Sequence, residues 1–96
     1  MINKVLGYIG LAIRGKYFFI GEDNLQKIKK GHLVVLAKDA SESLKEKVLF
    51  TANTKGVDVI DFYDKDTLGH LLNKNQVAIL VVTNYSLAAQ IKKILK

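Results

Sequence analysis

The sequence predicts an α/β protein: a three-layer α/β/α sandwich built on a small, mixed, four-stranded sheet. Hydrophobic periodicity switches repeatedly between the helical spacing i, i+3, i+4, i+7 and short β-prone runs. Two of those runs, residues 33–37 and 77–82, are apolar at every position, which is typical of strands covered on both faces. Strands that alternate with helices in this way favour a sheet with a helical layer on each side.

The first third of the chain predicts a helix, a strand and a second helix. Apolar residues recur at helical spacing over residues 2–13, and Gly15 should end that helix with a residue that tolerates a left-handed conformation. Residues 17–20 are aromatic or β-branched, which indicates a short strand. The second helix is expected over residues 22–30, with Gly31 as its end.

The buried strand over residues 33–37 is followed by a longer helix. Either Ser41 or Ser43 could cap this helix, which should reach Lys55 and end at Gly56. Its inward face is expected to carry Leu44, Val48 and Ala52. Residues 57–62 then alternate between apolar and polar, which predicts a half-exposed strand.

The last third predicts a short helix, the most apolar strand and a final helix. Asp64 or Asp66 could begin the short helix, and Asn84 or Ser86 could cap the final one. The strand over residues 77–82 should be central in the sheet, since it has no polar position. No proline and no low-complexity linker divides the chain, so residues 1–96 are interpreted as one domain.

The charge of the chain indicates the kind of partner. The net charge is +6 and the pI is about 9.6, which favours a polyanion, most often nucleic acid. The chain has no cysteine, which fits a reducing cytoplasm. Its longest apolar run, residues 77–82, is far too short to cross a bilayer. We therefore expect a cytoplasmic protein with no membrane contact.

Catalytic chemistry has little support in the sequence. The two histidines, His32 and His70, each follow a turn glycine and are expected at the surface or at a helix end. Neither has a serine or carboxylate partner at a motif spacing, and a general base needs a positioned partner. No glycine-rich phosphate loop is present. We expect no enzyme activity and no cofactor.

Four aspartates that cluster in sequence, Asp58, Asp61, Asp64 and Asp66, could suggest a site for a hard cation. The first two are an odd number of residues apart on the expected strand and so face opposite sides of the sheet. The other two are better explained as turn and N-cap residues. No metal site is therefore predicted.

Two polar edges are the best binding candidates. Residues 21–27 place a glycine and polar side chains where a strand turns into a helix, and backbone N–H groups at such a start favour anions. Residues 36–41 place Lys38 and Asp39 just beyond a buried strand. Side by side, these edges would form a surface suited to irregular RNA. Lys27 and Lys30 would supply positive charge near them, and Arg14 and Lys16 could extend it.

The same segments resemble a known family. Residues 21–27 (GEDNLQK), residues 33–41 (LVVLAKDAS) and the order of the elements are similar to the kink-turn RNA-binding ribosomal-protein superfamily. The small bacterial YlxQ-like and YbxF-like branch is the nearer match, through residues 10–16 (GLAIRGK), 67–70 (TLGH) and 81–83 (VVT). The resemblance extends over essentially the whole chain.

The resemblance implies an α/β/α sandwich that binds kink-turn RNA, an internal loop with tandem sheared G·A pairs. It implies that Gly21 allows close approach, that Asn24 meets a guanine edge and that Lys27 contacts phosphate. Lys38 and Asp39 would flank the groove, and the loop before the last strand would cover extruded bases. The implied RNA-binding residues are Gly21, Glu22, Asp23, Asn24, Lys27, Lys30, Lys38, Asp39, Lys74, Asn75, Gln76 and Val77.

The resulting functional hypothesis is a non-enzymatic, ribosome-associated RNA-binding protein of the bacterial cytoplasm. Structured RNA, including ribosomal RNA, is the expected partner, with ribosome- or translation-associated proteins as further candidates. The apolar composition is what one core needs, so a monomer is expected. The alternative is a protein-interaction module of the same fold without kink-turn recognition.

Overall fold

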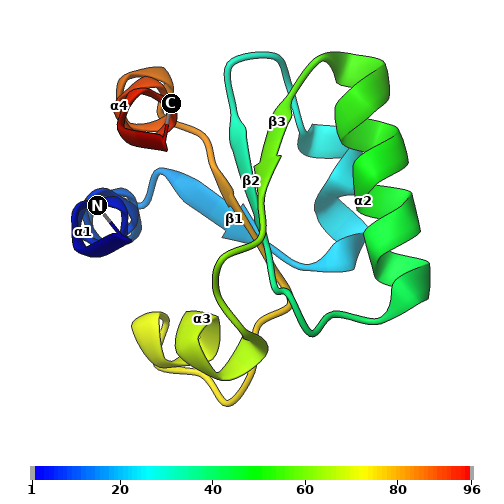
Figure 1. Cartoon of the computed structure of the whole chain (residues 1–96), viewed down its shortest axis with the longest axis horizontal. Coiled ribbons are helices and arrows are strands. Elements are labelled where there is room, and N and C mark those ends of the chain that lie inside the picture. The colour runs from blue at the N-terminus through cyan, green and yellow to red at the C-terminus, as the bar shows by residue number, and fades with distance from the viewer. Residues whose placement is uncertain (1, 96) are drawn as a thin grey trace.

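The computed structural model describes residues 2–95, in which four strands form one mixed sheet with the order β1-β4-β2-β3 (Figure 1). The strands are β1 (Phe18–Ile20), β2 (Leu33–Leu36), β3 (Asp58–Ile60) and β4 (Ile79–Val82). β4 pairs antiparallel with β1 and β2, and β2 pairs parallel with β3. β2 and β4 are central and buried at every residue, which confirms the interpretation of the two apolar runs.

Helices cover both faces of this sheet. α1 (Ile2–Arg14) and α4 (Tyr85–Leu95) lie side by side against one face, and α3 (Lys65–Leu71) lies at the lower end of the same side in Figure 1. α2 (Glu42–Lys55) and a short 3₁₀ helix, η1 (Glu22–Lys27), cover the other face. The expected three-layer sandwich on a mixed four-stranded sheet is confirmed.

The second helix is where the expectation was wrong. We expected a helix over residues 22–30, but the 3₁₀ helix ends at Lys27, and Ile28 is extended with φ −65° and ψ 132°. Ile28 is fully buried, so the chain straightens there to enter the core before β2. The Lys55 Nζ donates to the carbonyl oxygens of Gln26 (2.9 Å) and Ile28 (2.7 Å). This contact from α2 replaces the hydrogen bonds that a longer helix would have made.

Side-chain hydrogen bonds show which residue begins each helix for which the sequence offered two candidates. The backbone N–H of Leu44 donates to Ser41 Oγ (3.2 Å), so Ser41 caps α2. Asp64 Oδ1 accepts from the Thr67 N–H (2.8 Å) at α3, and Asn84 Oδ1 accepts from the Leu87 N–H (2.9 Å) at α4. The expected inward residues of α2, Leu44, Val48 and Ala52, are all buried.

The end of α1 differs in one detail from the expectation. The helix stops at Arg14, but the left-handed residue is Lys16, with φ 61°, and not Gly15. Gly15 instead makes room for the Tyr17 ring, since a Cβ there would lie 2.5 Å from Tyr17 Cε2. The predicted inward position of Ile2 falls outside the side chains that the structure describes. No helix in residues 2–95 is long and apolar enough to span a bilayer.

His32 is a buried residue, which corrects the expectation of a surface or helix-end position. Its side chain is only 7% exposed, and its Nδ1 accepts from the backbone N–H of Lys29 (3.1 Å). The rings of Phe19 and Tyr85 lie 6.2 and 6.1 Å from the imidazole, measured between centroids. His32 therefore combines a backbone hydrogen bond with packing against two aromatic rings.

Burial of His32 predicts that stability depends on pH. Burial, together with the charges of Lys29 and Lys55, lowers the pKa of His32 below its ordinary value of 6.5. Between the two pKa values the unfolded chain binds more protons than the folded one, so the free energy of unfolding falls as pH drops below about 6.5. Above that pH the imidazole is mostly neutral in both the folded and the unfolded chain, so His32 causes no loss of stability there. We expect urea unfolding at about pH 7.5 and 5.5 to show this loss. The His32→Asn variant should show a smaller loss, and an unchanged dependence would contradict the assignment.

Candidate nucleic-acid interface

The sheet topology brings several of the predicted binding residues to one end. β1 and β2 both finish where β4 begins, because Ile20 is opposite Leu80 and Leu36 is opposite Ile79. Just beyond, the Ala37 N–H donates to the Ala78 carbonyl (2.8 Å). We call this end of the molecule the proximal surface and define it by Gly21, Glu22, Lys38, Asp39, Lys74, Asn75, Gln76 and Val77.

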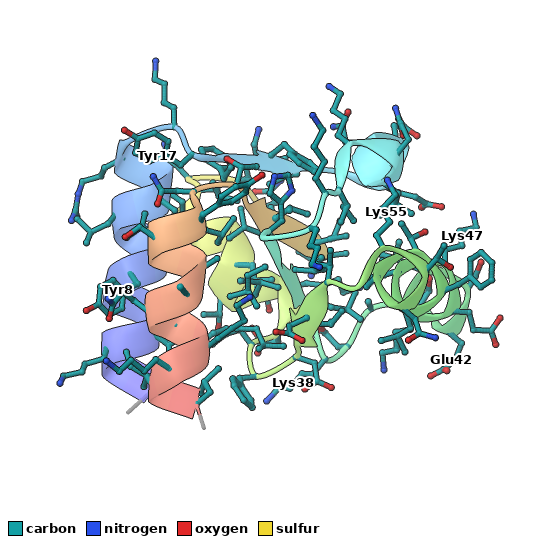
Figure 2. All side chains as sticks on the ribbon, turned by 90° about the horizontal axis from the view of Figure 1, so that it is seen from above. Tyr8, Tyr17, Lys38, Glu42, Lys47 and Lys55 are labelled. Carbon is teal, nitrogen blue, oxygen red and sulfur yellow. The ribbon has the colours of Figure 1, made fainter. Side chains whose placement is uncertain are left out.

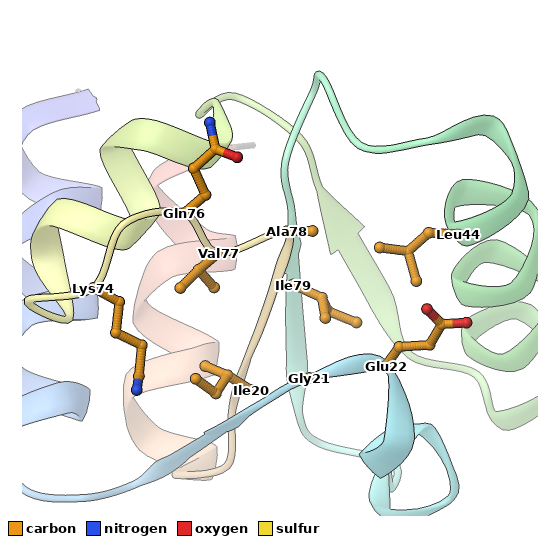
Figure 3. A pocket seen from close by; sticks show the side chains of 9 residues that line it. All are labelled: Ile20, Gly21, Glu22, Leu44, Lys74, Gln76, Val77, Ala78 and Ile79. Carbon is orange, nitrogen blue, oxygen red and sulfur yellow. The ribbon is translucent and has the colours of Figure 1, made fainter.

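A shallow cavity of about 230 Å³ lies within the proximal surface (Figure 3). It joins the residues after β1 with the loop before β4, two segments more than fifty positions apart in the sequence. The lining residues are Ile20, Gly21, Glu22, Leu44, Lys74, Gln76, Val77, Ala78 and Ile79. Five of the predicted binding residues therefore share one concave site.

The loop over residues 74–77 is held firmly by α3. The Lys74 N–H donates to the Gly69 carbonyl (2.8 Å), and the Val77 N–H donates to the Lys65 carbonyl (3.1 Å). The Gln76 Nε2 donates to Asp66 Oδ1 (2.9 Å). Because both ends of the loop are fixed in this way, the exposed Lys74 and Asn75 side chains are presented from a defined backbone.

Lys38 and Asp39 lie next to the start of α3. The Lys38 N–H donates to the Tyr63 carbonyl (2.9 Å), while its side chain is exposed. Asp39 Oδ1 accepts from the Lys65 N–H (2.8 Å), so this carboxylate caps the first turn of α3 together with Asp64. Hydrogen bonds from Thr67 lower the pKa of Asp64, and the charge of Lys38 lowers it further.

Most carboxylates near the proximal surface are already engaged within the protein. Glu22 Oε2 accepts from Lys47 Nζ on α2 at 2.7 Å, and this hydrogen bond raises the pKa of Lys47. Asp39, Asp64 and Asp66 accept the hydrogen bonds described above. Asp23 is exposed at the start of η1. The ion pair with Lys47 offsets the charge of Glu22, while Lys38 and Lys74 remain exposed.

Gly21 and Asn24 shape the backbone at the start of η1. Gly21 has φ 99° and ψ 141°, a conformation that favours glycine, so the chain can turn there with no side chain in the way. The Asn24 Nδ2 donates to the Ile20 carbonyl (2.8 Å), which turns this amide toward the protein. Since η1 has only six residues, its dipole is weaker than that of the longer helix we expected.

The structure separates Lys27 and Lys30 from the other predicted residues. Lys30 precedes the first residue of β2, whereas Lys38 follows the last, so the two lie at opposite ends of that strand. Lys27 lies between Gln26 and Ile28, whose carbonyl oxygens accept hydrogen bonds from Lys55 at the C-terminal end of α2. Lys38 lies near the other end of α2, which begins after Ser41. The two lysines are therefore near opposite ends of this helix.

Three residues contribute to the proximal surface that the sequence did not indicate: Leu44, Lys47 and Asp66. Leu44 lines the cavity, Lys47 pairs with Glu22 and Asp66 holds Gln76. Lys47 is 25 positions from Glu22, and Asp66 is 10 positions from Gln76. No local motif connects such positions, so only the tertiary fold reveals these contacts. Within residues 2–95, no group of three or more His, Asp or Glu side chains is placed to hold a metal ion.

The fold and this surface together define a small α/β/α protein with a concave loop surface that presents two exposed lysines. A sequence profile of the Ribosomal protein L7Ae/L30e/S12e/Gadd45 family matches residues 22–92. Because the match extends over more than half of the chain, the protein belongs to this family. The expected superfamily is thereby confirmed. None of the curated proteins matches the chain in sequence.

Solved structures share the whole fold. A Bacillus halodurans protein described as having unknown function is 23% identical, with a TM-score of 0.84 over 96% of each chain. A Giardia lamblia 15.5 kD RNA-binding protein is 17% identical, with a TM-score of 0.74 over 93% of this chain and 82% of its own. At these identities the likeness establishes the fold and no more.

Proposed function

We propose that this chain is a non-enzymatic RNA-binding protein that recognises kink-turn RNA through the proximal surface. The carrying observation is the cavity that joins Gly21 with the loop over residues 74–77 and is lined by Lys74, with the exposed Lys38 at the same end of the sheet. Membership of the family and the fold shared with an RNA-binding protein support the same proposal.

The proposed mechanism assigns different RNA contacts to the two lysines, to Gly21 with the neighbouring Asn24, and to the loop over residues 74–77. Lys38 and Lys74 would contact phosphates, which positions the RNA without reading its sequence. Gly21 would allow the RNA to approach the backbone, and Asn24 Oδ1 would accept from a base N–H while the amide stays bonded to Ile20. The loop over residues 74–77 would cover unstacked bases, since irregular RNA is read through such bases.

We further propose that residues 1–96 act as one RNA-binding domain, monomeric, in the bacterial cytoplasm and associated with the ribosome. The YlxQ-like branch is part of this proposal, through residues 10–16, 67–70 and 81–83. Lys27 and Lys30 are proposed as peripheral contacts, because they lie away from the cavity. They would contact phosphates only if a helical arm of the RNA extended past η1.

The proposal can be tested by titrating the protein into a kink-turn RNA and into a matched duplex with Watson–Crick pairs in place of the G·A pairs. We expect the kink-turn to bind at least about tenfold more tightly at about 150 mM salt, because shape-specific contacts persist when phosphate contacts are screened. Equal affinities that fall together with salt would contradict the proposal. Binding to neither RNA would also contradict it and would favour the protein-interaction alternative.

A further inference from the structure

A basic surface lies at the end of the sheet opposite the proximal surface. We call it the distal surface and define it by Lys16, Tyr17, Lys29, Lys30 and Tyr85, all of them exposed. The register pairs Phe18 and Leu33 with Val82, so the residues just before β1, before β2 and after β4 emerge at the same end. Figure 2 shows Tyr17 and Lys38 on opposite sides of the molecule.

Direct contacts join the three segments that form the distal surface. The Thr83 N–H donates to the Tyr17 carbonyl (2.9 Å), which ties the end of β4 to the start of β1. A Cβ at Gly31 would lie 2.8 Å from Tyr85 Cε1, so the Tyr85 ring rests on the Gly31 backbone. Gly31 has φ 95°, which independently favours glycine at this position.

The tyrosines are large exposed surfaces on a rigid support. Tyr17 is 48% exposed and Tyr85 is 61% exposed. Behind Tyr85, the buried His32 and then Phe19 form a series of ring contacts with centroid separations of 6.1 and 6.2 Å. Exposed aromatic rings that are fixed by their neighbours provide stacking surfaces at little entropic cost.

The charge of the distal surface is of one sign. Residues 14–17, 29–32 and 83–85 contain four cations and no Asp or Glu. The ion pairs found within residues 2–95 involve Lys45, Lys47 and Lys92, and none of these belongs to the distal surface. By contrast, the proximal surface includes Glu22 and Asp39. The distal surface therefore presents unneutralised positive charge to a polyanion.

We propose that the distal surface binds a single-stranded segment of RNA, a function separate from the recognition of a kink-turn by the proximal surface. Cations that track a backbone, with aromatic rings on which bases stack, are the two features that single-strand binding requires. An acidic protein segment would satisfy the cations. Acidic motifs are typically bound by clusters of arginine, whereas the distal surface combines three lysines with two exposed tyrosine rings.

The test uses fluorescein-labelled decauridylate and the full chain, with binding followed by anisotropy at several salt concentrations. Tyr85→Leu removes the stacking face and should weaken binding by about tenfold. Lys30→Gln should lower the salt slope of binding by about 0.7, the value for one phosphate contact on a single strand. Phe50→Leu and Lys45→Gln are controls of the same kinds on α2, outside the distal surface, and should leave binding unchanged.

Several results would overturn the proposal. These are no saturable binding of decauridylate, equal losses in the test and control variants, or equally tight binding of a glutamate decapeptide. Circular dichroism on each variant confirms that it is folded. Because Lys38 and Lys74 lie at the other end, Lys38→Glu with Lys74→Glu should leave decauridylate binding intact. Failure of kink-turn recognition can therefore be distinguished from failure of this proposal.

Discussion

Reversing two charges on the proximal surface, Lys38→Glu with Lys74→Glu, is expected to weaken kink-turn RNA binding by on the order of 100-fold. Each substitution removes a cation proposed to contact a phosphate and adds a repulsive carboxylate. The salt slope should fall by about 0.9 for each phosphate that the protein no longer neutralises. Isothermal titration at two or more salt concentrations measures both quantities. Both side chains are exposed, so the fold should persist.

A matched control separates a local effect from the loss of overall charge. Lys4→Glu with Lys93→Glu also reverses two exposed lysines, on α1 and α4, and both double variants take the net charge from +6 down by four units to +2. The control should retain most of the affinity, because those lysines lie outside the proximal surface. If the two double variants lose affinity equally, the RNA is held by general electrostatic attraction and the proposed site is wrong. Thermal unfolding of both variants excludes a folding defect.

The sequence predicted the layers of the fold because those depend on patterns that are local. The apolar runs of β2 and β4, the inward face of α2 and the glycine at its end are each visible within about fifteen residues. The nature of η1 was not predictable in the same way. Its early end depends on Lys55, which reaches the carbonyls of Gln26 and Ile28 from nearly thirty positions away. A tertiary contact overrides local helix propensity there.

The candidate site was predictable only in part, for a related reason. The residue pattern placed Gly21 and Lys38 at strand ends, and the family resemblance added the loop before β4; the sheet topology then gathers all three. The residue pattern also placed Lys27 and Lys30 with them, because both lay on the expected helix that begins beside Gly21. Which cations lie together depends on the path of the chain between η1 and β2. The buried Ile28 sets that path, and with it the existence of the distal surface.

Gly69→Ala is expected to destabilise the protein by about 1–3 kcal/mol, although alanine normally favours a helix by up to about 1 kcal/mol. Gly69 is buried in α3, and a Cβ there would lie 2.7 Å from the Asn75 carbonyl oxygen and 2.9 Å from Gln76 Cα. These are backbone atoms, so no side-chain rotation relieves the clash. The loop over residues 74–77 must move, or α3 must shift.

Gly7→Ala supplies the matched comparison, because Gly7 is also inside a helix but a Cβ there meets nothing within 4 Å. That variant should be stabilised by roughly 0.5–1 kcal/mol, the ordinary gain on replacing glycine in a helix. Urea unfolding of both variants, with equal m-values, measures the difference. A Gly69→Ala variant as stable as the wild type would show that the loop is not fixed against α3.

Gly69→Ala also connects stability to function. Displacement of the loop by Gly69→Ala should also weaken kink-turn binding under conditions where the variant is fully folded, because Lys74 and Gln76 line the cavity. Decauridylate binding should be unchanged, since the distal surface lies at the other end of the sheet from the loop over residues 74–77. Loss of both activities together would instead indicate global disorder, and the rigid presentation of the loop would then not explain the effect.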